Sequence, residues 1–317
     1  MQKILQKALH YKNISLRICF IFFSETATRF INAIFPPRCL KCSCSIIRIS
    51  ESFKKDTGYK QYPVSKKYLT YKKRIQHNFI LKEKTFLRTD EQVMTALFSD
   101  FFCYNCINET DFIPFKPPFC IKCGKQFKDQ AKGNHLCREC IEIRIGKVRA
   151  CGIYQGILRE SIHLFKYRGK TGLALPLELM LFRAFEKYFS LDNIDFIMPV
   201  PLHRAKLAKR GFNQSFLLIK DFRRLWKLTA GIYPQWKIDY TLLTRTKNTK
   251  SQTGFDKNDR KKNIKGAFKV MKPDKIKNKY IILVDDVYTT GSTVGESASV
   301  LLDAGALSVD VLVLARV

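Results

Sequence analysis

Residues 280–293 of this chain read YIILVDDVYTTGST, and they decide its fold class. The first five residues form an apolar run, which is typical of a buried parallel strand. Two adjacent carboxylates, Asp285 and Asp286, follow the run. A hydroxyl-rich turn around Gly291 comes next, with Ser292 and Thr293 available to cap a following helix. The stretch therefore predicts a strand, a loop and a helix of an open α/β sheet.

The loop at the end of this stretch has the chemistry of an anion site. In open α/β sheets, ligands bind at the carboxyl ends of the strands. Backbone N–H groups, hydroxyls and a helix N-terminus suit a phosphate, and the residues that offer them are Thr289, Thr290, Gly291, Ser292 and Thr293. The neighbouring carboxylates suit vicinal ribose hydroxyls, a divalent metal or both. The alternative is a structural turn, in which carboxylates cap the helix and hydroxyls close the turn.

The order of residues in this stretch distinguishes between known kinds of phosphate-binding motif. A Walker loop is excluded because no lysine directly precedes Ser292 and Thr293. An apolar strand, two aspartates, two residues and then Thr-Thr-Gly-Ser-Thr resembles instead the phosphoribosyl-pyrophosphate (PRPP) motif of type I phosphoribosyltransferases. The motif therefore favours a sugar phosphate as the ligand.

The positive charge of the chain also favours an anionic ligand. At 317 residues it is long enough for one large or two modest domains, and 57 Lys+Arg against 27 Asp+Glu give a net charge of +30. Such a charge favours nucleic acid, phosphate-rich ligands or acidic membrane, although a solvated cationic surface is the alternative. Residues 203–275 hold 20 basic and 5 acidic residues, which is half of the net charge. This basic segment directly precedes the Asp-Asp loop.

No transmembrane segment is predicted. The most apolar stretch near the start, Ile14–Phe35, is interrupted by Arg17, Glu25 and Arg29, and a bilayer needs about 20 mainly apolar residues in a row. We expect an amphipathic helix there, packed on its own protein or touching a membrane or partner. No clear signal-peptide cleavage site follows, so a cytoplasmic location is expected.

Cysteines give the second strong pattern. Eight of the eleven form four C-x-x-C knuckles: Cys39/Cys42, Cys103/Cys106, Cys120/Cys123 and Cys137/Cys140. The two-residue gap lets both thiolates of a knuckle bind one tetrahedral ion, so four knuckles predict two structural zinc ions. Disulfides would require an oxidising compartment, for which there is no export signal. Pairing of the last two knuckles would make a compact ribbon, but an interleaved cross-brace would use the same residues.

After the knuckles, the chain alternates strands and helices. The expected strands are 148–154, 195–200, 280–284 and 308–315, and the expected helices are 156–167, 172–188, 212–228 and 294–303. Such alternation predicts a parallel, doubly wound sheet.

Together these motifs resemble the ComF family, which links competence proteins of DNA uptake with gluconate-utilisation relatives. The resemblance rests on the knuckles, the Asp-Asp loop and four further segments, Pro199–His203, Arg210–Gln214, Gln252–Gly254 and Arg260–Phe268. It covers about residues 30–44 and 101–317. It implies a double zinc-ribbon domain over 36–147 and a type I phosphoribosyltransferase-like domain over 148–317. Composition alone, outside the resemblance, predicts the amphipathic N-terminal helix within 1–35 and a flexible basic insertion at 45–100.

The resemblance also implies roles for individual residues. Asp285 and Asp286 would hold the ribose hydroxyls of PRPP in the presence of Mg²⁺, and Thr289–Thr293 would wrap its 5′-phosphate. The segment Thr244–Gly266 would close over the site and exclude water. The pyrophosphate loop would comprise Val200, Pro201, Leu202, His203, Arg204 and Lys206.

Three functions are compatible with these expectations. The first is an active phosphoribosyltransferase that acts in natural transformation on an unknown acceptor. The second is a non-catalytic protein that senses PRPP or nucleotides. The third is an adaptor that binds single-stranded DNA and works with a competence helicase.

Overall fold

The computed structural model describes residues 37–46, 97–108, 117–127, 129, 133–141, 143–190, 193–249 and 257–317. The helix predicted over 1–35 and most of the insertion predicted over 45–100 lie outside these residues. No helix of the described part is long and apolar enough to cross a membrane.

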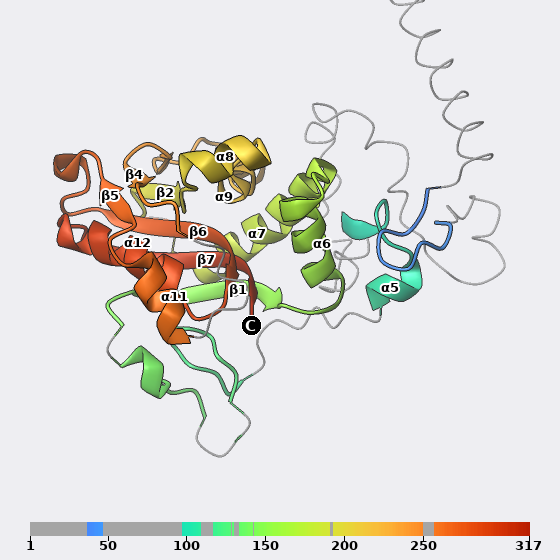
Figure 1. Cartoon of the computed structure of the whole chain (residues 1–317), viewed down its shortest axis with the longest axis horizontal. Helices are drawn as coiled ribbons and strands as arrows, with labels where there is room; N and C mark the ends of the chain where they lie inside the picture. The colour runs from blue at the N-terminus through green and yellow to red at the C-terminus, as the bar shows by residue number, and fades with distance from the viewer. Residues whose placement is uncertain are drawn as a thin grey trace, which may run out of the picture.

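A five-stranded parallel sheet forms the centre of the molecule (Figure 1). Its strands, in spatial order, are β1 (Val148–Ile153), β7 (Ser308–Arg316), β6 (Tyr280–Tyr288), β2 (Phe196–Pro199) and β3 (Lys237–Ile238). All four neighbouring pairs are parallel. The sheet confirms the predicted architecture. The edge strand β3 was not predicted, because two residues are too few to show an alternating pattern.

Helices cover both faces of the sheet, as the strand patterns predict. One core contains residues of α6 (Gly156–Tyr167), α7 (Ala174–Tyr188) and α10 (Phe222–Ala230), and Leu217 of α9 (Gln214–Leu217) packs against it. The other core contains residues of α12 (Ser292–Asp303). Ile282 and Val284 of β6 belong to the first core, and Ile281 and Leu283 belong to the second. Because successive side chains of a strand point to opposite faces, this alternation shows that β6 is buried on both sides.

The remaining elements are short. A separate antiparallel hairpin pairs β4 (Leu243–Arg245) with β5 (Phe268–Val270). The other helices are α5 (Tyr104–Asn108), α8 (Arg204–Arg210) and α11 (Lys257–Ile264), with 3-10 turns at Arg138–Cys140, Thr171–Leu173 and Pro273–Lys275. β4 overlaps only the start of the segment Thr244–Gly266, which was expected to form a closing loop, and β5 follows the end of that segment. Helix α11 lies within the segment, so its described part is more ordered than predicted.

The helix predicted over 212–228 is wrong in one respect, because the structure divides it into α9 and α10. Asn213 begins α9 by accepting hydrogen bonds from the backbone N–H groups of Ser215 and Phe216 at 3.0 and 3.4 Å. The buried carboxylate of Glu178 accepts the N–H of Asp221 at 2.8 Å. That hydrogen bond holds the break between the two helices, and the local sequence cannot show it.

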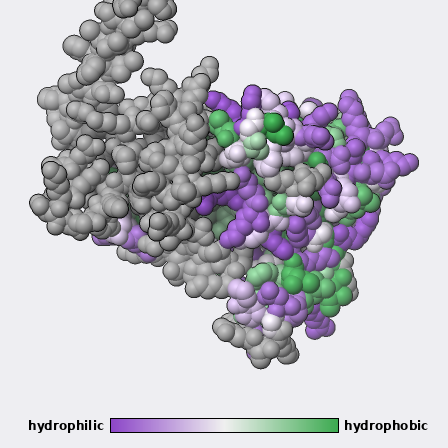
Figure 2. Space-filling view, turned by 180° about the vertical axis from the view of Figure 1, so that it is seen from behind, coloured by the Kyte–Doolittle hydropathy of each residue, from purple (hydrophilic) through white to green (hydrophobic). Residues whose placement is uncertain are grey.

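The cysteine knuckles pack against different faces of the sheet. Cys39 and Cys106 belong to the core that contains α6, whereas Cys120 and Cys137 belong to the core that contains α12. The described residues of the segment 117–145 lie below β1 in Figure 1. Ile121, Leu136 and Ile141 are exposed on this segment, and hydrophobic surface gathers at the lower end of the molecule, where the segment lies (Figure 2).

Candidate functional site

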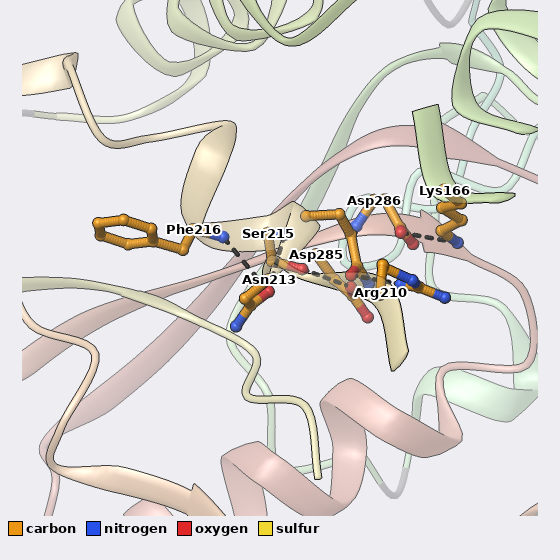
Figure 3. Close-up of polar contacts among 8 residues, drawn as sticks. Lys166, Arg210, Asn213, Ser215, Phe216, Asp285 and Asp286 are labelled. Carbon is orange, nitrogen blue, oxygen red and sulfur yellow. Dashed lines mark hydrogen bonds and ion pairs between the residues drawn. The ribbon is translucent and has the colours of Figure 1, made fainter. Parts of the chain in front are cut away.

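The two aspartates lie inside strand β6 rather than after it. The predicted strand ended at Val284, but the observed strand continues to Tyr288, and both carboxylates are buried. Asp285 accepts a hydrogen bond from the hydroxyl of Ser215 at 3.0 Å and another from the N–H of Asp286 at 2.9 Å (Figure 3). Helix α9 therefore fixes the orientation of Asp285.

Asp286 has a different partner, which the sequence did not reveal. Lys166 Nζ, in the last turn of α6, lies 2.6 Å from Asp286 Oδ2, with the two side chains 17% and 4% exposed (Figure 3). Burial alone would lower the pKa of Lys166, but the charges of Asp286 and Asp285 raise it above its ordinary value. The site therefore contains a lysine that stays protonated and neutralises part of the acidic pair.

The protonation of Asp285 is set by its surroundings. Burial is the largest cause, and together with the neighbouring charge of Asp286 it raises the pKa of Asp285 to about 7, against the opposing effects of Lys166 and Ser215. A carboxyl with this pKa changes charge near neutral pH. A cation or a set of hydroxyl donors that favours the carboxylate form would bind more tightly as the pH rises through this value.

The anion loop, Thr289–Thr293, connects β6 with α12. Gly291 takes a left-handed conformation with φ 74° and is the N-cap of α12, so the prediction of a Ser292 or Thr293 cap is wrong. The hydroxyls of Thr290 and Ser292 lie 2.8 Å apart, and the N–H of Ser292 donates to Thr290 Oγ1 at 3.4 Å. The loop therefore presents hydroxyls at the N-terminus of a twelve-residue helix, a favourable place for an anion.

A second loop, Val200–His203, leaves the sheet beside the aspartates. The N–H of Val200 donates to the carbonyl of Val284 at 2.8 Å, directly before Asp285. His203 caps helix α8 by accepting the N–H of Ala205 at 3.2 Å. Pro201 and Leu202 are half-buried in this loop, and Arg204 and Lys206 lie on α8. The structure thus places the predicted pyrophosphate loop next to β6, but turns its basic end into a helix.

Three cations form a cluster near these loops: Lys206 and Arg210 of α8 and Arg245 of β4. Burial, followed by the charges of Arg245 and Arg210, lowers the pKa of Lys206. Burial also lowers the pKa of Arg245, although the charge of Asp285 opposes it. Cations that repel one another in this way would be stabilised by a multiply charged anion.

Each arginine of the cluster is held by its own neighbours. Arg210 Nη1 donates to Gln214 Oε1 at 2.5 Å, and Arg245 donates to the hydroxyl of Thr249 while its guanidinium lies 5.3 Å from the ring centroid of Phe268. The sequence predicted neither arginine as a site residue. Only the excess of basic residues over 203–275 pointed toward them.

The cysteines form two tetrads, in which the sulfurs lie within 4.8 Å of one another. The first tetrad is Cys39, Cys42, Cys103 and Cys106, and the second is Cys120, Cys123, Cys137 and Cys140. Of the two pairings that the spacing allowed, the structure shows the one with a compact ribbon. Cys44 lies outside the knuckles, and its sulfur is 3.3 Å from that of Cys42. Each tetrad could hold a metal ion.

Curated proteins of known name resemble this chain over most of their length. The DNA utilization protein YhgH of Escherichia coli K12 is 34% identical over 203 residues, covering 62% of this chain and 83% of that protein. The chain belongs to the ComF family. Competence protein F of Haemophilus influenzae is 29% identical over 63% of this chain and 85% of its own length. Competence protein ComFC of Bacillus subtilis is 26% identical over 69% of this chain and 81% of its own length.

Other comparisons with this ComF-family chain are less informative. No family model matches it. Among solved structures, the hypoxanthine-guanine phosphoribosyltransferase of L. donovani matches 44% of this chain and 67% of its own length, with 15% identity and a TM-score of 0.25.

Proposed function

We propose that this ComF-family protein binds PRPP with Mg²⁺ at the end of β6 and acts in DNA uptake. One observation carries the proposal: a buried aspartate pair, a glycine-containing anion loop and a cationic cluster meet at one edge of the sheet. PRPP combines the three groups that these features suit, namely a 5′-phosphate, a ribose diol and a diphosphate. The names of the curated relatives support a role with DNA.

Each part of PRPP has a candidate partner. The anion loop would hold the 5′-phosphate through its hydroxyls and backbone N–H groups. Asp285 and Asp286 would accept hydrogen bonds from the ribose hydroxyls, and their oxygens would be suitable ligands for a Mg²⁺ ion, which would supply positive charge to the diphosphate. The loop Val200–His203, with Lys206 and the two arginines of the cluster, would face the diphosphate.

The Lys166–Asp286 ion pair is part of this assignment. A ribose hydroxyl or a metal ion that takes the Asp286 oxygen must share it with Lys166 or displace it. Since Lys166 is held near the site on α6, a displaced ammonium would remain close enough to meet a ligand phosphate. The pair therefore keeps the acidic site neutralised before the ligand arrives.

Phosphoribosyl transfer is the reaction that this arrangement would support. The bond between the anomeric carbon and the diphosphate oxygen would break, and the bond to an acceptor nucleophile would form. The cationic cluster would stabilise the leaving diphosphate, and the aspartates would stabilise the positive charge that develops on the ribose. The acceptor is unknown, and binding without turnover, as in a PRPP sensor, is the second candidate.

We further propose that each cysteine tetrad holds a structural zinc ion. Four sulfurs within 4.8 Å of one another suit the tetrahedral four-thiolate coordination that zinc adopts in closed structural sites. Such sites supply folding energy and leave no position for a substrate. This assignment is compatible with a reducing, cytoplasmic location, where thiols persist.

Calorimetry with Mg-PRPP tests the proposed ligand. Wild type should bind, and an Asp285→Asn/Asp286→Asn variant should lose at least about tenfold in affinity, since hydrogen bonds to charged groups contribute about 1.5–3 kcal/mol each. Asp303→Asn is the matched control, because Asp303 is exposed on α12 and pairs only with Arg144 and Ser299 among the described contacts. No heat of binding with wild type would refute the proposal.

Two further measurements separate the functions. Release of diphosphate in the presence of nucleobases, amines or DNA would show transfer, whereas binding without release would favour the sensor. For single-stranded DNA, which the net charge of +30 favours, the affinity should fall with salt as phosphate contacts are screened. A flat plot of log affinity against log salt would contradict the DNA-binding adaptor and its use with a helicase.

A further inference from the structure

The knuckle Cys120–Cys123 is tied to the sheet through three consecutive carbonyl groups. The carbonyl of Ile121 accepts from Arg149 Nη2 at 3.0 Å, and that of Lys122 accepts from the N–H of Val148 at 2.7 Å. The third carbonyl, of Cys123, accepts from Arg316 Nη1 at 2.6 Å. Strands β1 and β7, the first and last of the sheet along the chain, therefore hold the backbone of a metal-binding knuckle.

Arg316 also reaches the other part of the site. Its guanidinium carbon lies 5.0 Å from the centroid of the Tyr288 ring, at the end of β6 and directly before the anion loop. Tyr288 is 5% exposed and shares one hydrophobic core with the four cysteines of the second tetrad. One side chain therefore contacts both the knuckle and the last residue of the strand that carries the aspartates.

Tyr288 in turn packs against the turn of the anion loop. A Cβ added at Gly291 would lie 2.4 Å from Tyr288 Oη and 2.6 Å from Cζ, so the phenol occupies the space beside this glycine. Gly291 holds φ 74°, and the N–H of Gly295 donates to its carbonyl at 2.7 Å. A shift of the Tyr288 ring would therefore change the turn that begins α12.

We propose that Arg316 is a positioning residue that couples metal binding at the second tetrad to the conformation of the anion loop. Metal bound by the four thiolates fixes the knuckle and the Cys123 carbonyl. The fixed carbonyl holds Arg316 over Tyr288, and Tyr288 supports the turn at Gly291. The consequence for a phosphorylated ligand rests on the proposed function, whereas the effect on the loop itself does not.

Two other arginines near the second tetrad provide matched controls. Arg144 pairs with Asp303 of α12 at 2.5 Å, but both side chains are more than half exposed. This ion pair does not involve the anion loop. Arg149 donates to the carbonyls of Ile121 and Lys122, so it supports the knuckle from β1. Each control removes an arginine from the same region without removing the group over Tyr288.

The first experiment needs no ligand. Hydrogen exchange of the full chain loaded with two equivalents of zinc is followed at the amides of the anion loop. Arg316→Met should exchange there about tenfold faster than wild type while it retains both metal ions, whereas Arg144→Met and Arg149→Met should match wild type at the loop. Unchanged exchange at the loop in Arg316→Met with both ions bound would overturn the proposal.

Two further variants guard against trivial outcomes. Arg316→Lys keeps a donor for the Cys123 carbonyl but loses the flat guanidinium over Tyr288. If Arg316→Met does not fold, exchange at the anion loop is compared between Arg316→Lys and wild type instead, with the same expected acceleration. Cys137→Ser removes the ion of the second tetrad, and Cys103→Ser removes that of the first. Only Cys137→Ser should accelerate exchange at the loop; equal acceleration by both variants would overturn the coupling.

The second experiment uses Mg-PRPP, and binding free energies that are coupled must be coupled in both directions. In the Cys103→Ser background, saturating Mg-PRPP should slow transfer of zinc from the second tetrad to a chromophoric chelator by about fivefold or more, and Arg316→Met should abolish this protection. Bound Mg-PRPP without slower metal release would overturn the proposal. Absence of Mg-PRPP binding would refute the proposed function alone, because the exchange experiment decides the coupling separately.

Discussion

Replacing Lys166 with methionine should destabilise the protein by about 3–4 kcal/mol at pH 7, because it leaves a buried carboxylate without its cation. Methionine keeps most of the apolar length of lysine, so the main change is the loss of the ammonium 2.6 Å from Asp286. Breaking a buried ion pair on one side costs about 3–5 kcal/mol, and the 4% exposure of the Asp286 side chain places this pair among the buried ones.

Proton uptake by the unpaired carboxylate of Asp286 sets the upper end of the expected destabilisation. A buried carboxylate without a partner can become neutral, and for an ordinary aspartic acid at pH 7 this costs about 4 kcal/mol. The destabilisation should therefore shrink by about 1.4 kcal/mol for each unit by which the pH is lowered from 7. Such a pH dependence distinguishes a buried charge from a packing defect, which would cost the same at every pH.

Urea unfolding of the zinc-loaded protein measures the effect through its two tryptophans, Trp226 and Trp236. The double variant Lys166→Met/Asp286→Asn should regain most of the lost stability, since no charge is left unpaired. Lys187→Met, at an exposed position in the last turn of α7, is the control and should match wild type. A loss below about 1 kcal/mol, or a double variant less stable than Lys166→Met, would refute the reasoning.

Three other predictions concern stability, the loop and the metals. Burial raises the pKa of Glu178 to about 8, so its contribution to stability is complete below the unfolded value of 4.5 and is lost as the pH rises through 8. Between these two pH values, Glu178→Gln should gain about 1.4 kcal/mol of stability relative to wild type for each pH unit, as measured by urea unfolding. Gly291→Ala should abolish Mg-PRPP binding in calorimetry, because its Cβ would meet Tyr288, whereas Gly295→Ala has open space and should bind like wild type. Metal analysis should find two zinc ions per chain, and Cys137→Ser and Cys103→Ser should each retain one.

Much of the fold could be predicted because its signals are local. An apolar run followed by two aspartates placed β6, and the C-x-x-C spacing placed the cysteines of both tetrads on four short knuckles. Helix 156–167 was predicted with the bounds that the structure shows. In these cases, the residues that determine an element lie within that element, so the sequence pattern was sufficient.

The parts that could not be predicted depend on contacts between distant residues. Lys166 reads as an ordinary polar residue in the last turn of an amphipathic helix, and its partner Asp286 lies 120 positions later in the sequence. Arg245 belongs to a three-residue strand whose partner begins at Phe268, beyond helix α11. Likewise, only the buried Glu178 shows where α9 gives way to α10.

The position of β7 between β1 and β6 has a consequence for the order of folding. Within the described sheet, β1 pairs only with β7, so the first strand acquires its hydrogen-bonding partner when the last strand arrives. Such pairing of distant segments is intrinsically slow, because the long loop between them must close first. Until then, β1 is an unpaired strand edge, which is a site for aggregation. The cysteine tetrads close much shorter loops, so early metal binding would shape the first half of the chain while the sheet is still open.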